Sequence, residues 1–278
     1  MKKTWMLAAC VLLFLVSGCK DHKIDKMVNQ MVGTQVIAHR GYWKCEGSAQ
    51  NSISSLRNAH QAGVYGSEFD VQITADSVLI VNHDNEFKGH VINLTLYEVI
   101  KDSLLSNGEK LPTLEEYLAA GKKLKGLQLV LELKPVKENP ALEQYAVEKC
   151  VEMVKKMGLE QRVDYISFSL EACKRFAALM PRASVAYLGG YYMPIELLEM
   201  GINGFDYHYN EVLMNPFWVD EARNYNMTSN VWTVNDSLLI ETLLVGNPSF
   251  LTTDNPEDVT RQIDALKERV RERFTGKQ

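Results

Sequence analysis

The chain has 278 residues, of which 46% are hydrophobic and 23% charged, and its formal net charge is −5. These values are ordinary for a folded globular domain and exclude an intrinsically disordered chain. Because binding to a phosphate backbone needs a basic stripe, the absence of any long lysine or arginine run excludes nucleic acid as the main partner. The length fits one α/β barrel of about 250 residues behind a leader.

The first residues have the features of a targeting segment. Lysines follow the initiator, residues 5–16 are apolar, and two small residues precede Cys19. An apolar run this short does not comfortably span a bilayer core of about 30 Å as a permanent helix. Residues 16–19 resemble the lipobox of bacterial lipoproteins, which implies removal of residues 1–18 as a signal peptide and acylation of the Cys19 thiol.

Acylation of Cys19 would make the protein an exported lipoprotein of a bacterial cell envelope, anchored to a membrane without spanning it. The alternative is an ordinary secretory signal that happens to contain a cysteine. The stretch after Cys19 is polar and weakly patterned, so we expect residues 19–34 to form a tether. Residues 35–278 would then form the folded domain.

Short β-branched runs alternate with helical stretches through the rest of the chain. Strands are expected at residues 35–39, 67–74, 128–134, 163–169, 184–188, 204–209, 229–234 and 250–253. Helices are expected at residues 52–62, 114–120, 140–157, 170–180, 194–200, 216–225 and 236–245. Eight strands separated by helices are typical of a closed parallel barrel, so we predict a TIM-type (β/α)8 barrel.

One strand-like segment, at residues 78–83, interrupts this alternation. It follows the second strand after only three residues, which predicts a hairpin. Residues 84–112 then read as a small irregular insertion before a helix whose start, Thr113 with Glu116, fits a capping box. Long loops in compact domains are usually functional, and this one follows directly on a histidine–aspartate pair.

Two acidic side chains share one face of the second predicted strand. Glu68 and Asp70 are two residues apart, so they point the same way, toward the barrel interior, while their apolar neighbours face the helices. Two carboxylates there would repel each other and lose solvation, so the site needs either a cation or a protonated carboxyl group. Ligands that are all oxygen favour Mg²⁺ or Ca²⁺.

The third predicted strand repeats this pattern with Glu132 and Lys134 on its inner face. Both lie near the carboxyl end of the strand, where barrel enzymes build their active sites. Glu132 is therefore a candidate third metal ligand and Lys134 a candidate phosphate contact. The alternative for these two residues is a structural ion pair.

Two histidines end strands beside the acidic pair. His39 ends the first strand and His83 ends the hairpin strand. An unperturbed imidazole titrates near ~6.5, which suits proton transfer at neutral pH. Arg40 follows His39 directly, and its planar guanidinium can hold a phosphate group through two hydrogen bonds.

These segments, in this order, resemble the glycerophosphodiester phosphodiesterase family. The resemblance runs from about Val36 to Pro256 and is carried by the segments 37–41, 50–52, 68–76, 81–84, 131–134, 231–235 and 252–256. It implies a barrel phosphodiesterase with one divalent cation and an insertion after the histidine–aspartate motif. The implied reaction hydrolyses glycerophosphodiesters to sn-glycerol 3-phosphate and an alcohol.

The resemblance also implies roles for eight side chains. These are His39 and His83 as general acid and base, Glu68, Asp70 and Glu132 as ligands of Mg²⁺ or Ca²⁺, Arg40 and Lys134 as phosphate contacts, and Trp232 as a wall of the glycerol pocket. One departure is clear: Gln50 stands where the family commonly has a glutamate. An uncharged amide there removes a negative charge, which would change metal affinity or substrate preference if the family glutamate contacts the metal region.

Three alternative functions remain open at this point. A related phospholipase would act on intact lipid, which a membrane anchor makes geometrically possible. A barrel that binds phosphodiesters without turnover would be consistent with Gln50. A Schiff-base lyase would use Lys134, but it would leave the acidic pair without a task.

Overall fold

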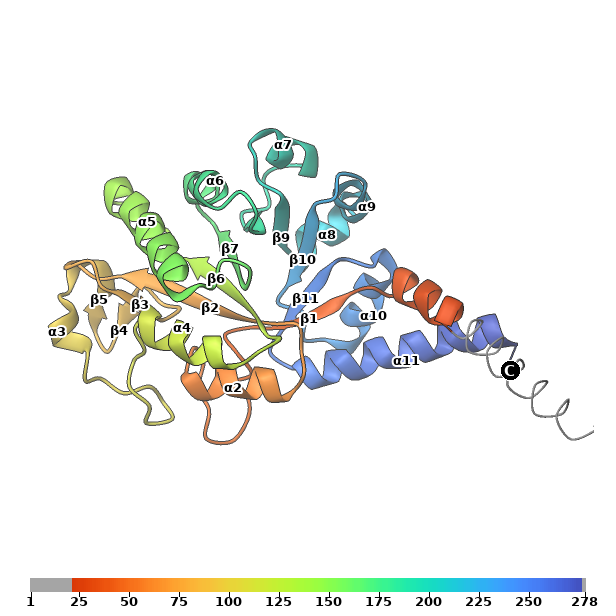
Figure 1. Ribbon diagram of the computed structural model, residues 1–278, viewed down its shortest axis with the longest axis horizontal. Coiled ribbons are helices and arrows are strands. Elements are labelled where there is room, and N and C mark those ends of the chain that lie inside the picture. The colour runs from red at the N-terminus through yellow and green to blue at the C-terminus, as the bar shows by residue number, and fades with distance from the viewer. Residues whose placement is uncertain (1–21, 277–278) are drawn as a thin grey trace, which may run out of the picture.

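The computed structural model describes residues 22–276, and its centre is a closed barrel of eight parallel strands (Figure 1). The barrel strands are β1 (Gln35–Ala38), β2 (Gly66–Ile73), β6 (Gln128–Leu133), β7 (Val163–Ser167), β8 (Val185–Tyr187), β9 (Gly204–His208), β10 (Thr228–Trp232) and β11 (Phe250–Thr253). They pair in the order β1-β11-β10-β9-β8-β7-β6-β2, and β1 also pairs with β2, which closes the ring. The predicted TIM-type barrel and all eight of its strands are confirmed.

Helices follow the strands and cover the outside of the barrel. They are α2 (Ile53–Gln61), α4 (Leu114–Lys123), α5 (Pro140–Met157), α6 (Leu170–Leu179), α7 (Pro194–Glu199), α8 (Tyr209–Met214), α9 (Phe217–Asn224), α10 (Ser237–Gly246) and α11 (Pro256–Thr275). The predicted capping box is present at α4, where Thr113 and Glu116 satisfy each other's backbone amides. The sequence analysis did not predict α8 or α11.

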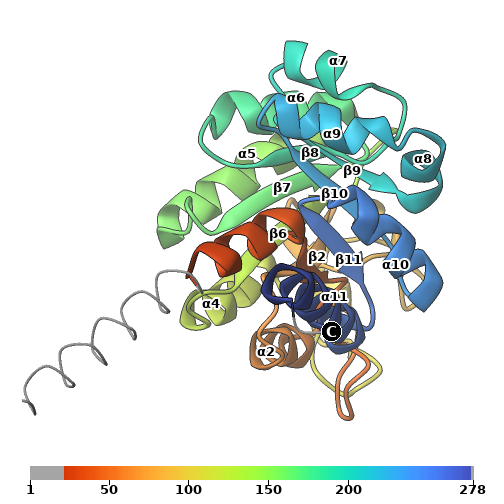
Figure 2. The same ribbon diagram turned by 90° about the vertical axis from the view of Figure 1, so that its right-hand side faces the viewer.

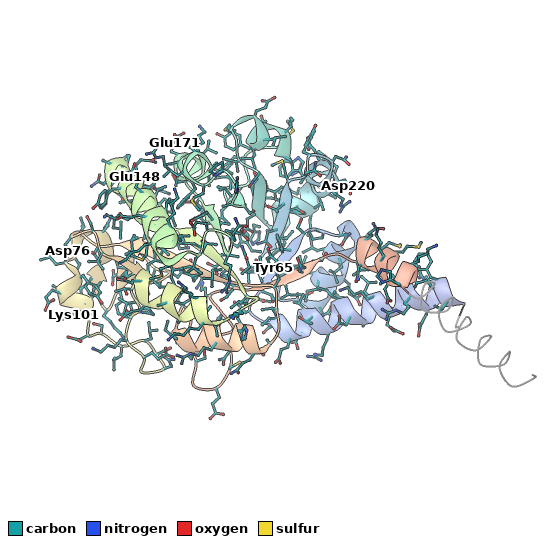
Figure 3. The ribbon with its side chains drawn as sticks, in the orientation of Figure 1. Tyr65, Asp76, Lys101, Glu148, Glu171 and Asp220 are labelled. Carbon is teal, nitrogen blue, oxygen red and sulfur yellow. The ribbon has the colours of Figure 1, made fainter. Side chains whose placement is uncertain are left out.

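The alternation of side chains along each strand separates the core from the site. On β2, Phe69, Val71 and Ile73 point outward and are buried beneath the helices, in the main hydrophobic core. Charged side chains lie on the outside of the molecule: in Figure 3, Glu148 and Glu171 lie on the outer side of the helices. Tyr65 lies near the centre of the same view. Tyr65 stacks on Phe250 with ring centroids 4.7 Å apart.

The predicted hairpin and insertion are both present after β2. Strand β3 (Leu79–Val81) runs antiparallel to β2, and the insertion contains β4 (Glu86–Phe87), β5 (His90–Val91), a 3-10 turn (Ile92–Leu94) and α3 (Tyr97–Ile100). The insertion packs on β3 through a small hydrophobic cluster, made by Ile80 of β3 with Phe87, Ile92, Ile100 and Leu111. It is therefore a packed subdomain and not an open loop.

The segment predicted as an irregular tether differs from expectation. Residues 22–31 form a helix, and Figure 2 shows it crossing the end of the barrel at which the strands begin. Ile24, Val28 and Val32 are buried, Arg271 on α11 donates to Asp25, and the Gly33 amide donates to Asn247. Apolar residues spaced four apart give this helix a buried stripe, which explains why it packs on the barrel.

Within residues 22–276, no helix is both long and apolar enough to cross a membrane. The predicted signal peptide, residues 1–18, and the predicted acylation site, Cys19, lie outside the described residues.

Candidate active site

A small cavity of about 130 Å³ opens at the end of the barrel where the strands finish. Seven of the eight side chains that the sequence singled out in the domain line it: His39, Arg40, Glu68, His83, Glu132, Lys134 and Trp232. The eighth, Asp70, is 1% exposed and lies beside them in the same cluster of carboxylates. The sequence-predicted residues are thus gathered in one place.

Three carboxylates meet on the wall made by β2 and β6. Glu68, Asp70 and Glu132 are all buried, and each offers one oxygen within 4.8 Å of the other two. The register of the sheet produces this arrangement, because Asp70 on β2 lies opposite Glu132 on β6. The Oε1 atom of Glu68 is buried and has no hydrogen-bond partner in the described part of the chain. Three oxygen ligands at this spacing could hold a hard divalent cation.

Burial and crowding shift the pKa values of these acids. Burial, and then the charges of Asp70 and Glu132, raises the pKa of Glu68 well above its ordinary value. Burial and the charge of Asp70 raise the pKa of Glu132 to about 7. Without a cation, these shifts favour protonation of Glu68 and Glu132, and a bound cation would favour the ionised form of the same two groups.

Lys134 supplies the nearest positive charge to the acids. Its Nζ lies 2.8 Å from Oδ1 of Asp70 and 2.6 Å from Oε1 of Glu132. Burial alone would lower the pKa of Lys134, but these two carboxylates raise it, so the lysine stays charged. Although burial opposes ionisation of Asp70, Lys134, His83 and Arg40 hold its pKa below the ordinary value.

Arg40 sits between the acids and Gln50. Its backbone N–H donates to Oε2 of Glu68 at 2.7 Å, and its Nε lies 3.6 Å from Oδ2 of Asp70. Its Nη1 donates to Oε1 of Gln50 at 2.7 Å, so Gln50 contacts the arginine. The tight turn needs Gly41, since a Cβ there would lie 2.4 Å from Oγ of Ser55 and its φ is +73°.

The two histidines are each held by an aspartate through Nδ1. Nδ1 of His39 lies 2.8 Å from Oδ1 of Asp254, which directly follows β11. Although burial, the largest effect, opposes ionisation, hydrogen bonds from His39, Asn235 and Trp43 hold the pKa of Asp254 at about 2, so the ionised carboxylate accepts a hydrogen bond from Nδ1–H of His39. This contact leaves Nε2 of His39 free of Asp254.

His83 has a similar but more exposed contact. Its Nδ1 lies 2.7 Å from Oδ1 of Asp84, and its side chain is 37% exposed, against 18% for His39. Burial, the largest effect, lowers the pKa of His83, although Asp70 and Asp84 act in the opposite direction. A lowered pKa keeps this imidazole neutral, and therefore able to accept a proton, at neutral pH.

The opposite wall, made by β9, β10 and β11, is polar but carries little charge. Asp206 accepts a hydrogen bond from Asn230 at 3.0 Å, and Asn230 also donates to Thr252. Burial raises the pKa of Asp206 to about 8, so its carboxyl group is neutral at pH 7. Nε1 of Trp232 donates to the backbone oxygen of Asp206 at 2.9 Å, which fixes the indole as part of the wall.

Several residues of this site were not singled out from the sequence. Asp254 orients His39, Asn51 donates to Asp70 at 2.8 Å, and Asp206 and Phe168 line the cavity. Asp254 and Asn51 fall inside segments that carried the family resemblance, and Asp254 directly follows a predicted barrel strand. That position, at the carboxyl end of a strand, was the available signal.

Fold and site together define a class: TIM-barrel enzymes that bind an anionic substrate at the carboxyl ends of the strands. A family model described as "Glycerophosphoryl diester phosphodiesterase family" matches residues 39–258. The chain therefore belongs to this family of phosphodiesterases, as its sequence motifs predicted.

Individual relatives agree with this assignment. A curated glycerophosphodiester phosphodiesterase of Caldanaerobacter subterraneus is 27% identical over 242 residues, covering 81% of this chain and 95% of that protein. A crystal structure of a glycerophosphodiester phosphodiesterase from Parabacteroides distasonis is 51% identical, with a TM-score of 0.82 over 84% of this chain and 97% of that one.

A third relative carries a ligand. A phosphodiesterase of Oleispira antarctica, solved in complex with the product sn-glycerol-3-phosphate, is 24% identical, with a TM-score of 0.69. The match covers 83% of this chain and 96% of that one, and at this identity it supports the fold alone.

Proposed function

We propose that this chain hydrolyses glycerophosphodiesters to sn-glycerol 3-phosphate and an alcohol, using a bound divalent cation and two histidines. The observation that carries the proposal is the meeting of three buried carboxylates and two aspartate-held histidines at one small cavity. The carboxylates would bind a cation and the histidines would transfer protons. Phosphodiester hydrolysis uses both.

Glu68, Asp70 and Glu132 would hold the cation. The buried Oε1 of Glu68 without a partner, and the raised pKa values of Glu68 and Glu132, are what a carboxylate cluster built around a cation is expected to have. Mg²⁺ and Ca²⁺ both fit oxygen ligands of this kind. When bound, the cation would supply positive charge beside the phosphodiester oxygens.

Arg40 and Lys134 would bind the phosphate group from the protein side. Both line the cavity, and both lie within ion-pair distance of Asp70. Their N–H groups would stabilise negative charge on the phosphate oxygens as the transition state forms. Trp232 would bound the space that receives the glycerol carbons.

His39 and His83 would move the protons. Each has Nδ1 occupied by an aspartate, so Nε2 is the atom left for the substrate. One Nε2 would take the proton of the attacking oxygen. Attack by water would give sn-glycerol 3-phosphate directly, whereas attack by the substrate's own glycerol hydroxyl would give a cyclic phosphate that water then opens to the same product. The other Nε2 would give a proton to the leaving alkoxide as its bond to phosphorus breaks.

A substrate panel with and without chelator tests this proposal. We expect glycerophosphocholine, glycerophosphoethanolamine and glycerophosphoglycerol to release sn-glycerol 3-phosphate, with turnover lost in chelator and restored by Mg²⁺ or Ca²⁺. Vesicles of intact phosphatidylcholine provide the control for the phospholipase alternative. Hydrolysis that is unchanged in metal-free enzyme, or that is confined to intact lipid, would contradict the proposal.

We also propose that Cys19 carries the lipid anchor and that the protein is an exported lipoprotein. The proposal rests on the apolar segment and the small residues before Cys19. Metabolic labelling with radioactive palmitate should mark the wild-type chain and not a Cys19→Ala variant. Equal labelling of both chains, or cleavage at a different residue, would contradict it.

A further inference from the structure

A second hollow lies beside the active site, between the loop that follows β1 and the insertion. It is an open groove of about 680 Å³, far larger than the catalytic cavity. Its lining includes Trp43, Lys44 and Gln50 from the β1 loop and Phe87, Lys88 and Leu104 from the insertion. The roles proposed above use none of these residues.

Two hydrogen bonds connect the groove to the catalytic residues. Gln50 lines the groove and accepts from Arg40, which lines the catalytic cavity. Trp43 lines the groove, and its Nε1 donates to the same Asp254 oxygen that holds His39. A phosphodiester bound at Arg40 would therefore have one of its two ester groups close to the groove.

The volumes of the catalytic cavity and of the groove indicate where the glycerol half and the alcohol half of the substrate lie. A cavity of about 130 Å³ is too small for a whole diester, since ligand sites usually measure about 300–1,000 Å³. It has room for the compact glycerol group. The alcohol half of the bound substrate must then extend out of the cavity. The groove of about 680 Å³ lies beside the cavity and can receive it.

The groove is positively charged in a protein whose net charge is −5. Lys44 and Lys88 contribute two ammonium groups, and none of the described residues that line the groove is acidic. Nζ of Lys44 is partly occupied, at 3.0 Å from Oδ1 of Asn255 and 4.0 Å from Asp254. Within residues 22–276, no carboxylate lies within ion-pair distance of Lys88, so its charge is available to a ligand.

Apolar side chains line the groove beside the two ammonium groups. Trp43 and Phe87 present aromatic rings and Leu104 is 46% exposed. The ammonium groups of Lys44 and Lys88 lie 5.5 and 5.8 Å from the adjacent ring centroids. Aromatic faces next to cations suit a polyol framework that carries an anionic group.

We propose that this groove binds the alcohol half of the substrate and selects alcohols that carry a further negative charge, such as a polyol phosphate. The inference rests on the proposed function, because it assigns the second half of the same substrate. The alcohol would lie along Trp43 and Phe87, with its extra anionic group near Lys88.

Three glycerophosphodiesters that differ in the charge of the alcohol test the proposal with metal-loaded enzyme. They are glycerophosphocholine, glycerophosphoglycerol, and glycerophosphoglycerol with a second, terminal phosphate. We expect kcat/KM to rise in this order, with the terminal phosphate worth about 3- to 10-fold over glycerophosphoglycerol at low salt. The advantage should shrink at high ionic strength, because both charges are exposed to solvent.

A charge-reversal variant provides the residue-level test. Lys88→Glu should remove the preference for the terminal phosphate and favour the choline ester. Lys125→Glu is the matched control, because it changes the net charge by the same amount as Lys88→Glu. Lys125 is exposed and precedes β6, at the opposite end of the barrel. The control variant should leave all three ratios unchanged.

The outcomes separate the two proposals. Equal use of all three esters by wild-type enzyme, or equal shifts in Lys88→Glu and Lys125→Glu, would overturn the groove assignment while hydrolysis itself still supports the proposed function. Failure of metal-loaded wild-type enzyme to cleave any of the three esters would overturn the proposed function and this inference with it.

Discussion

The two walls of the catalytic cavity bury acidic side chains to similar depths but arrange them differently. On the β2–β6 wall, three carboxylates lie together beside Lys134. On the β9–β11 wall, Asp206 lines the cavity and accepts a hydrogen bond from the amide of Asn230. Burial raises the pKa of Glu132 to about 7 and that of Asp206 to about 8. Burial alone therefore does not make a cation site, and the grouping of the acids distinguishes the two walls.

The largest expected effect comes from making the same chemical change on each wall. Glu132→Gln should lower kcat/KM by about 10³-fold, because an uncharged amide removes one of three proposed metal ligands. Asp206→Asn should cost less than about tenfold, since this carboxyl group is already neutral at pH 7. Steady-state kinetics at saturating Mg²⁺, with calorimetric metal titration, measure both. Equal losses in the two variants would show that the comparison of the walls is wrong.

The histidines follow different strands, β1 and β3, so separate variants test whether both imidazoles take part in proton transfer. His39→Ala and His83→Ala should each lower kcat by about 10²–10⁴-fold with little change in metal affinity. His60→Ala is the control, because His60 lies outside the cavity and contacts the backbone oxygen of Lys125. Turnover near the wild-type value in either variant would remove that histidine from the mechanism.

Asp254→Asn isolates the orienting contact of His39. The amide keeps the shape of the side chain but can donate to Nδ1, which favours the wrong tautomer of the imidazole. We expect kcat to fall by about 10²-fold while KM changes little. A loss confined to KM would mean that Asp254 acts on substrate binding and not through His39.

The same variant carries a pH signature in stability. With its pKa held at about 2, Asp254 adds stability above its unfolded value of about 4, and this contribution disappears as the pH falls through 2. Asp254→Asn should thus cost about 2 kcal/mol at neutral pH and progressively less toward pH 3. Denaturant unfolding across that range gives the difference, and a constant difference at every pH would contradict the assignment.

The smallest effect is expected from Gln50→Glu, which adds one charge near the β2–β6 wall. Gln50 contacts Arg40, so the new carboxylate would pair mainly with the guanidinium. Such a partly exposed pair is worth about 0–1 kcal/mol, and kcat/KM should change by less than about fivefold. A tenfold or larger rise in metal affinity by calorimetry would show instead that position 50 reaches the cation.

The barrel and the carboxylate wall were predictable because both depend on local patterns. Alternation along β2 and β6 sent Glu68, Asp70 and Glu132 inward, and the parallel register brought them together. The pair of His39 and Asp254 was harder to predict, because 215 residues separate the partners. Only closure of the ring through β1 and β11 makes them neighbours.

Two other features depended on contacts that a single strand does not reveal. Burial raises the pKa of Asp206, and the hydrogen bond from Asn230 on the next strand opposes that shift; neither influence is visible in the segment that contains Asp206. The helix over residues 22–31 did carry a signal, since Ile24, Val28 and Val32 are four residues apart. The polar composition around them hid this helical stripe.

The position of that helix limits the length of the linker between the barrel and the proposed anchor. Residue 22 is three residues beyond Cys19, so a stretch of at most about 10 Å, if extended, separates Cys19 from a helix fixed across the starting ends of the strands. If Cys19 is anchored, the barrel would stand on its closed end, with the catalytic mouth turned toward water. Phospholipids of the supporting membrane would then be out of reach, and the enzyme would draw on esters already freed of their acyl chains.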